Sequence, residues 1–270
     1  MKGPYPLKLD LQQQLTMFVH QKTDIHISKQ IIEHGIWESY ETSLLLTLLS
    51  PGRTFIDVGA NMGYYTLIGS LLVGEQGRVV AFEPEQENFT LLEKNILNNK
   101  LANVVAVNAG LSDHHADGKL YLNDKNLGDH QIYQPANNAV SRAEQSIQLL
   151  QGDDFLLHRL TSPVSRIDVL KVDTQGAEFV VLTGLMPLLK QSLPELKMIV
   201  EFTPYSLKQA GASGMALLDI VVELGLPMQL IDHLGRKLVP ISEIEMRQWI
   251  EQTDAAVGNQ GFINLLVGHY

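Results

Sequence analysis

The sequence predicts an α/β fold in which helices cover both faces of a mostly parallel sheet. From residue 51 onward, short apolar runs alternate with segments whose apolar residues recur at helical spacing. The runs are nearly continuous in apolar residues, as in parallel strands buried on both faces. The chain has 270 residues, of which 45% are hydrophobic and 19% charged, enough for an ordinary globular core.

The elements follow in order along the chain. Residues 1–50 are expected to form a mostly helical N-terminal cap segment, closed by a helix over 40–49 and the breaker Ser50-Pro51-Gly52. The main domain is expected over 51–270. Its seven strands are predicted at 54–58, 78–82, 104–107, 167–172, 197–202, 228–232 and 261–267. Its helices are predicted at 64–73, 87–99, 178–189 and 214–224. The last two strands are expected to pair as an antiparallel C-terminal edge.

Between about residues 120 and 165 the periodicity is lost. This stretch is polar and contains Gly128, Pro135, Asn137 and Gly152. Long irregular insertions in compact domains usually serve as lids or binding loops. We therefore expect the insertion to close over a bound acceptor molecule.

Composition excludes several classes of function. Twenty Lys and Arg against thirty Asp and Glu give a net charge of −10, so the chain lacks the basic footprint of nonspecific nucleic-acid binding. The absence of cysteine excludes disulfides, thiolate zinc sites and cysteine nucleophiles. No apolar run approaches the roughly 18 residues of a membrane span, and the first ten residues lack a signal-peptide core. We expect a cytoplasmic protein without nucleic-acid or membrane partners.

The most informative segment is Asp57-Val-Gly59-Ala-Asn61-Met-Gly63, which runs from a strand through a tight turn into a helix. Gly59 permits the sharp turn and close approach of a ligand, and Gly63 permits close packing of the helix. A dinucleotide fingerprint needs glycine where Asn61 stands, because pyrophosphate oxygens require bare backbone there. A nicotinamide-dependent oxidoreductase therefore remains a disfavoured alternative.

The same pattern resembles motif I of class I S-adenosylmethionine-dependent methyltransferases, which have a Rossmann-like fold. That cofactor has no phosphate, and its ammonium and sulfonium cations suit a pocket with Asp57 nearby. Asn61, Tyr65 and Thr66 open the following helix and are expected to meet the methionyl carboxylate. Tyr65 is equally consistent with a place in the core.

Two later segments add to the expected cofactor site. Glu83 lies twenty residues after Gly63 at the end of the second strand, where an acidic residue binds ribose hydroxyls in doubly wound folds. The alternative is a solvated carboxylate. Ser112 and Asp113 follow the third strand and are expected near the adenine, although a solvated turn explains Asp113 equally well.

Together, the glycine turn, the Ala81-Phe-Glu-Pro84 segment and the Leu170-Lys-Val-Asp-Thr-Gln-Gly-Ala-Glu178 segment resemble FkbM-type methyltransferases. The resemblance extends from about residue 35 to 202, and more loosely to the C-terminus. It implies O-methylation of a small-molecule hydroxyl, on a sugar or secondary metabolite, with S-adenosyl-L-methionine converted to S-adenosyl-L-homocysteine. One departure is that Thr174-Gln175 replaces the family's usual Val-Glu, which leaves a catalytically weak or inactive cofactor-binding protein as an alternative.

Asp173 and His130 are the candidate catalytic residues. Asp173 ends the fourth strand beside the expected crevice and shares a sheet face with Lys171. It could orient the acceptor, act as a base or ligate a metal, or instead cap the next helix. His130, beside Asp129 in the insertion, suits a general base or forms a loop hydrogen bond. A divalent metal on these residues is conceivable, but no ligand spacing supports it.

Further carboxylates are weaker candidates. Glu38 and Glu41 precede the first strand on a segment that could cover the cofactor and help form the acceptor pocket, or simply face solvent. Glu201 ends the fifth strand near the crevice. Apolar residues in the N-terminal segment could join protomers in a homo-oligomer or pack within the monomer. The identity of the acceptor is not encoded in any of these patterns.

Overall fold

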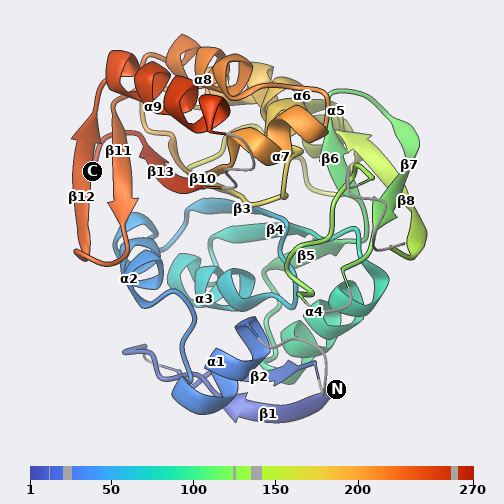
Figure 1. The fold of residues 1–270 in the computed structure, drawn as a ribbon. Helices are drawn as coiled ribbons and strands as arrows, with labels where there is room; N and C mark the ends of the chain where they lie inside the picture. The colour runs from blue at the N-terminus through green and yellow to red at the C-terminus, as the bar shows by residue number, and fades with distance from the viewer. Residues whose placement is uncertain (12, 21–25, 124–125, 135–141, 257–260) are drawn as a thin grey trace.

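A central sheet of eight strands organises the protein (Figure 1), in the order β12-β11-β13-β10-β9-β3-β4-β5. The structure is a computed structural model that describes residues 1–11, 13–20, 26–123, 126–134, 142–256 and 261–270. The parallel strands are β3 (Thr54–Val58), β4 (Arg78–Phe82), β5 (Val104–Val107), β9 (Val169–Val172) and β10 (Lys197–Phe202). The antiparallel edge consists of β11 (Met228–Asp232), β12 (Lys237–Ile241) and β13 (Ile263–Val267).

All seven predicted strands are present, and β11 and β13 pair antiparallel as expected. The eighth strand, β12, was not predicted. It contains Pro240 and has only exposed and half-buried residues. A proline of this kind is tolerated only at a sheet edge, where no ladder hydrogen bond is lost. The apolar pattern of a buried strand is therefore absent from β12.

Helices cover both faces of the sheet, as Figure 1 shows. One face carries α1 (Ile27–His34), α2 (Ser39–Leu48), α3 (Tyr64–Val73) and α4 (Gln86–Asn98). The other carries α6 (Glu178–Gln191), α7 (Pro204–Gln209), α8 (Gly214–Glu223) and α9 (Glu243–Ala255). Adjacent residues of β3 serve different cores, because Phe55 packs with the first group and Ile56 with the second. This confirms a doubly covered sheet.

The N-terminal segment corrects the expectation of mostly helical structure. β1 (Lys2–Pro6) and β2 (Thr16–Val19) form an antiparallel pair. Side chains of α4 satisfy the free edge of β2, since the Phe18 amide donates to Asn95 Oδ1 at 2.7 Å and Asn95 Nδ2 donates to the Phe18 carbonyl at 3.0 Å. Hydrophobic periodicity carries no sign of such asparagine contacts. The boundary between a cap and a main domain remains a prediction.

The insertion and the residues just before it also contain more regular structure than expected. β6 (Gly110–Ser112), β7 (Ala116–Tyr121) and β8 (Glu144–Gln151) form a separate three-stranded sheet. A short helix α5 (Gly152–Asp154) and a π-helical turn η1 (Phe155–Arg159) follow β8. Residues 124–125 and 135–141, including the predicted loop positions Pro135 and Asn137, lie outside the described residues. The lid function remains a prediction.

Among the helices of the described ranges, none combines the length and the apolar character that crossing a membrane would require.

Candidate active site

The turn between β3 and α3 has the backbone conformation that its glycines suggest. Gly59 has a φ of 83°, and a Cβ there would overlap the Asp173 carbonyl oxygen. Asn61 is also left-handed, with a φ of 51°, a region that asparagine tolerates better than most residues. Gly63 has a φ of 92°, and its missing side chain gives room to Leu92 of α4. Gly63 thus shapes the turn by packing on a helix, whereas Gly59 and Asn61 line cavities.

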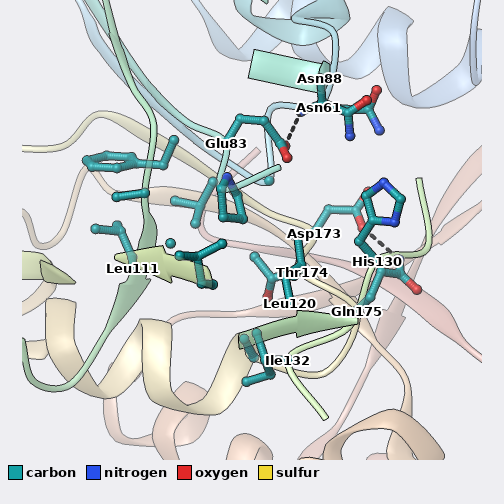
Figure 2. A pocket seen from close by; sticks show the side chains of 18 of the residues that line it. Asn61, Glu83, Asn88, Leu111, Leu120, His130, Ile132, Asp173, Thr174 and Gln175 are labelled. Carbon is teal, nitrogen blue, oxygen red and sulfur yellow. Dashed lines mark hydrogen bonds between the residues drawn. The ribbon is translucent and has the colours of Figure 1, made fainter. Parts of the chain in front are cut away.

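A crevice lies at the carboxyl ends of β3 and β4 (Figure 2). Its polar side includes Asn61, Glu83, Asn88, Ser112 and His130. Its apolar walls are formed by Leu111, Leu120, Ile132, Ile147 and Leu149. A flat apolar group therefore fits between the walls while polar groups face Glu83 and the turn.

Glu83 is fixed where β4 meets the glycine turn. One carboxylate oxygen accepts the Asn61 amide at 2.7 Å, and the other accepts the Glu85 amide at 2.9 Å. Burial raises the pKa of Glu83 to about 7, against the lowering effect of these two amides. Its position in the crevice is the one expected of a ribose-binding acid.

Asp57 and Thr66 lie elsewhere than the sequence suggested. Thr66 Oγ1 donates to Asp57 Oδ2 at 2.6 Å, both side chains are buried, and neither residue is part of the described lining of the crevice. Burial raises the pKa of Asp57 to about 6, opposed by Lys171 and Thr66. The hydrogen bond joins α3 to β3 beneath the glycine turn, so the pair holds these two elements together.

Ser112 and Asp113, the two residues expected near the adenine, lie in different places. Ser112 is buried and lines the crevice. Asp113 instead accepts from His114 Nδ1 at 2.6 Å at the partly exposed end of β6, away from the described lining. This placement agrees with the solvated-turn alternative for Asp113.

Two further cavities adjoin the crevice. The first, the turn cavity, lies against the glycine turn and is lined by residues including Asn61, Tyr65 and Lys171. The second, the acidic cavity, lies beyond it and includes Glu38 and Glu201. Asp173 and Gly128 line all three cavities. Asp173 therefore stands where the three spaces meet.

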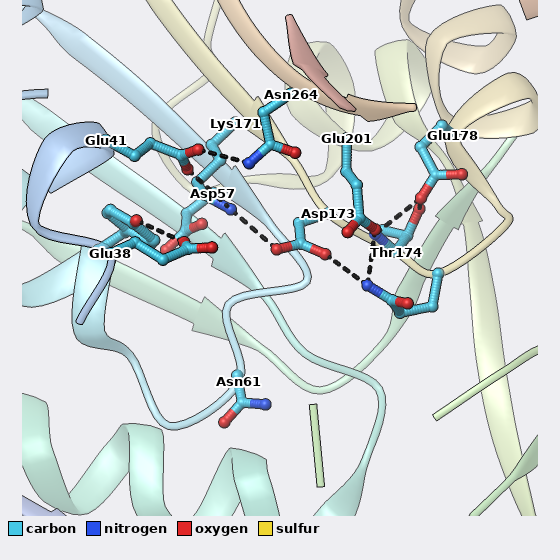
Figure 3. Close-up of polar contacts among 12 residues, drawn as sticks. Glu38, Glu41, Asp57, Asn61, Lys171, Asp173, Thr174, Glu178, Glu201 and Asn264 are labelled. Atoms are coloured by element: carbon cyan, nitrogen blue, oxygen red, sulfur yellow. Dashed lines mark hydrogen bonds and ion pairs between the residues drawn. The ribbon is translucent and has the colours of Figure 1, made fainter. Parts of the chain in front are cut away.

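Asp173 is held by donors on both sides (Figure 3). Lys171 Nζ lies 3.1 Å from one carboxylate oxygen, and Gln175 Nε2 lies 3.0 Å from the other. Burial works against ionisation, but the attraction of Lys171 and these hydrogen bonds outweigh it and lower the pKa of Asp173. The carboxylate is therefore ionised at neutral pH. The cap of α6 is Ala177, so Asp173 does not cap that helix.

Lys171 is the buried cation beneath this network. Its Nζ lies 3.7 Å from Glu41 Oε1 and 4.7 Å from the centre of the Tyr65 ring. Asp57 is its direct neighbour across the β3–β9 ladder. Burial disfavours its charge, yet Asp173, Glu41 and the nearby acids raise the pKa of Lys171. It is charged and supports the acids around it.

His130 lines the crevice in a state that does not fit a general base. Its Nδ1 accepts the Asn123 amide at 3.0 Å, so in the neutral ring the proton resides on Nε2. Burial, together with His20 and Arg142, lowers the pKa of His130 to about 4. The neutral ring can donate a hydrogen bond through Nε2, which differs from the predicted proton-accepting role; a catalytic role for His130 remains a prediction.

The loop that carries His130 is tied to the glycine turn. Asn61 Nδ2 and Asn88 Nδ2 each donate to the Leu127 carbonyl at 3.1 Å. Gly128, the next residue, packs against Ile27 of α1. These contacts bring part of the insertion against the glycine turn and α4, and Asn88 was not singled out by the sequence.

Metal coordination finds no support in the geometry. Within the described ranges, no group of three or more His, Asp or Glu side chains is arranged to hold a metal ion. The carboxylates near Asp173 contact Lys171 and Gln175 instead.

Sequence reasoning gave low weight to several residues that the site uses. Glu38 and Glu201 were weak candidates, whereas Lys171 was noted only as a neighbour of Asp173. The alternation of a strand puts Lys171 on the face of Asp173, but it gives no sign that this lysine is buried and shared with Glu41. Tyr133, which lines the acidic cavity from the insertion, had no signal in the sequence.

Comparisons with known proteins agree with this geometry. The family described as the Methyltransferase FkbM domain matches residues 57–252. A methyltransferase 1 from Beauveria bassiana is 29% identical over 151 residues, which cover 50% of this chain and 59% of the relative. A probable cobalt-precorrin-6B C(15)-methyltransferase (decarboxylating) from Sulfurisphaera tokodaii is 41% identical over 59 residues, covering 22% of this chain and 31% of the relative. The chain thus spans less than two thirds of the length of these curated relatives.

A solved structure of a methyltransferase FkbM from Methylobacillus flagellatus is also similar, with a TM-score of 0.46 and 14% identity. The match covers 84% of this chain and 50% of that one. The family match extends over more than half of the chain and includes the glycine turn, Glu83 and Asp173. The chain belongs to the FkbM methyltransferase family.

Proposed function

We propose that this protein transfers the methyl group of S-adenosyl-L-methionine to a hydroxyl oxygen of a small molecule. The observation that carries the proposal is the position of Asp173, an ionised carboxylate at the meeting point of the crevice, the turn cavity and the acidic cavity. Family membership supports methyl transfer as the reaction.

The residues of the crevice fit this cofactor. Glu83 faces the position of a ribose, and the walls around Leu111 and Leu149 suit the flat adenine. The turn cavity, with Asn61 and Tyr65, suits the methionyl group. When bound, S-adenosyl-L-methionine supplies an activated methyl group on a positively charged sulfur.

The protein then contributes mainly position. Asp173 accepts a hydrogen bond from the acceptor hydroxyl and orients its oxygen towards the methyl carbon, and it takes up the hydroxyl proton as the oxygen–carbon bond forms and the sulfur–carbon bond breaks. The loop around Gly128 limits the entry of water from the insertion side. Lys171 keeps Asp173 ionised for this purpose.

Calorimetric titration of S-adenosyl-L-methionine and S-adenosyl-L-homocysteine tests the cofactor assignment. We expect binding in the micromolar range, weakened at least tenfold by Glu83→Ala, since two buried amides lose their acceptor along with the ribose contact. Glu87→Ala is the matched control, because Glu87 lies four residues further along the chain and is exposed in the first turn of α4. A folded, cofactor-free protein that binds neither compound would refute the assignment.

An inactive cofactor-binding protein is the second candidate, favoured by one observation. Gln175 places a neutral amide between Asp173 and Glu201, at 3.0 and 2.7 Å, where the family usually has a carboxylate. Incubation with methyl-labelled S-adenosyl-L-methionine and a panel of hydroxylated metabolites distinguishes the two. A labelled O-methyl product excludes the inactive alternative, whereas cofactor binding without transfer to any compound supports it.

A further inference from the structure

The acidic cavity presents three carboxyl groups from three separate elements. Glu38 precedes α2, Asp173 follows β9, and Glu201 lies in β10 next to Asp173, because Val200 pairs with Val172. Figure 3 shows Asp173 between Glu38 on one side and Glu201 on the other. The cavity therefore has an acidic floor.

The cations near this floor are already engaged. Lys171 is shared between Asp173 and Glu41, at 3.1 and 3.7 Å. Across the cavity, Arg142 contacts the Asp129 carboxylate at 3.4 Å and the Asp129 carbonyl at 3.1 Å. Glu38 and Glu201 receive only neutral donors in the described contacts, namely the Tyr65 hydroxyl and the Gln175 amide.

The pKa shifts of Glu38 and Glu201 indicate that this floor would accommodate a further positive charge. Burial, with repulsion from Glu41 and Asp173, raises the pKa of Glu38 to about 8, although Lys171 and the Tyr65 hydroxyl oppose the shift. Burial and the neighbouring Asp173 and Glu178 likewise raise the pKa of Glu201. A cation between these groups would favour their ionised forms.

A second feature of the cavity independently indicates a ligand. Tyr133 lines the same space, and only 8% of its surface is exposed. Its hydroxyl faces Ser206 without completing a hydrogen bond, and it has no partner within the described part of the chain. Burial raises the pKa of Tyr133 to about 12, so the hydroxyl keeps its proton. A buried hydroxyl without a partner is costly unless a ligand supplies one.

The walls of the cavity suit an organic cation. Trp37, Tyr205 and Phe262 contribute aromatic rings to the lining. Aromatic faces attract ammonium groups as well as apolar carbon. A hydrated inorganic ion would gain little from such walls, and the described carboxylates do not form a metal site.

We propose that the acceptor carries a positively charged amino group beside its hydroxyl, held between Glu38 and Glu201. The amino group neutralises the acidic floor, a polar atom of the same molecule meets the Tyr133 hydroxyl, and the acceptor oxygen faces Asp173. This inference rests on the proposed function, because it names the substrate class of the same site.

The test measures binding of matched probes to the protein saturated with S-adenosyl-L-homocysteine. Tyramine is compared with 4-ethylphenol and glucosamine with glucose, so that each pair differs chiefly in the amino group. We expect the amine of at least one pair to bind at least ten times more tightly than its neutral partner. Glu201→Gln and Glu38→Gln should each reduce that ratio to about threefold or less.

Glu223→Gln is the control, because Glu223 forms a half-exposed ion pair with Lys190 and is not part of the described lining of the three cavities. It should leave the amine preference intact. Unchanged affinity for S-adenosyl-L-homocysteine verifies that each variant is folded. Absence of an amine preference in both pairs, or a preference that survives both carboxylate substitutions, overturns the inference. Failure to bind S-adenosyl-L-homocysteine at all would instead refute the proposed function.

Discussion

The crevice and the acidic cavity meet at Asp173 but are built in different ways. The crevice depends on the turn after β3 and the end of β4, where backbone amides of Asn61 and Glu85 hold Glu83. The acidic cavity is assembled from side chains of distant segments, including Trp37, Tyr133 and Phe262.

This difference matches the groups that each space is proposed to hold. An invariant cofactor can be recognised by backbone geometry, which residue types such as glycine determine locally. An acceptor is recognised by the charge and shape of side chains, which long-range packing brings together. The following variants separate the two kinds of construction, beginning with the largest expected effect.

The acidic cavity depends on its buried cation. Lys171→Met should lower the free energy of unfolding by about 3–5 kcal/mol, because the buried Glu41 and the half-buried Asp173 are left without a cation. Without Lys171 the pKa of Asp173 rises in the folded state, so the loss should be largest at high pH and shrink as the pH falls.

Chemical denaturation at pH 5 and pH 8 measures this effect. Lys190→Met is the control, since its ion pair with Glu223 is half exposed, and it should cost less than about 1 kcal/mol. Equal losses for the two lysines would show that the buried network contributes no special stability.

The crevice depends instead on backbone conformation. Gly59→Ala should destabilise the protein by about 3 kcal/mol, from the left-handed φ and the overlap with the Asp173 carbonyl. Gly52→Ala is the matched control, because Gly52 has a φ of 84° with no atom within 4 Å of the added Cβ. It should cost about 1–2 kcal/mol, and thermal unfolding compares the two. Similar losses would argue against the close approach of β9 to the turn.

Both regions contribute to the pH dependence of stability. The folded-state pKa values of Asp57, Glu83 and Glu38 are raised to about 6, 7 and 8, well above their ordinary values. Stability associated with their protonated forms is fully present below about pH 4 and is lost as the pH rises through 6 to 8. The melting temperature of the unliganded protein should therefore fall from pH 5 to pH 8.

Glu38→Gln should flatten the upper part of this decline, between pH 7 and 8, and Glu83→Gln the part around pH 7. Exposed Glu87→Gln should leave the slope unchanged. A wild-type melting temperature that rises over the same interval would contradict the raised pKa values.

The smallest effect is expected at His130. Because its Nδ1 is occupied by the Asn123 amide, His130→Ala should change the affinity for S-adenosyl-L-homocysteine by no more than about threefold. The pH profile of turnover should show no change centred at the ordinary pKa of histidine. A chelator should leave the turnover rate unchanged. A loss of turnover on treatment with chelator that added metal restores would reinstate a metal at this site.

The sequence predicted the central elements well because each has a local cause. Seven strands follow from continuous apolar runs, and the turn at Gly59 follows from residues that tolerate a left-handed backbone. The strands β2 and β12 were missed because their stability comes from Asn95 and from an edge position. β8 was missed because it belongs to a separate small sheet rather than to the buried one.

The residues of the site also fall into those that local sequence predicted and those that it misplaced. Glu83 and Asp173 were identified because the ends of parallel strands meet at one edge of the sheet. Asp57 and Thr66 were assigned to the cofactor although they bond to each other beneath the turn. Sequence spacing gives the element on which a side chain stands, but not which neighbour occupies its polar atoms.

The amino-acid sequence by itself therefore determined the doubly covered sheet, the glycine turn, the position of Glu83 and the family resemblance, since periodicity and backbone preference act over a few residues. Only the tertiary structure decided that Glu38, Asp173 and Glu201 share one cavity near Lys171 and that His130 accepts a hydrogen bond from a backbone amide. It also decided that the Tyr133 hydroxyl is buried without a partner among the residues that the structure describes. Charge balance and burial depend on residues far apart in the chain, and their contacts exist only once the sheet and its helices have packed.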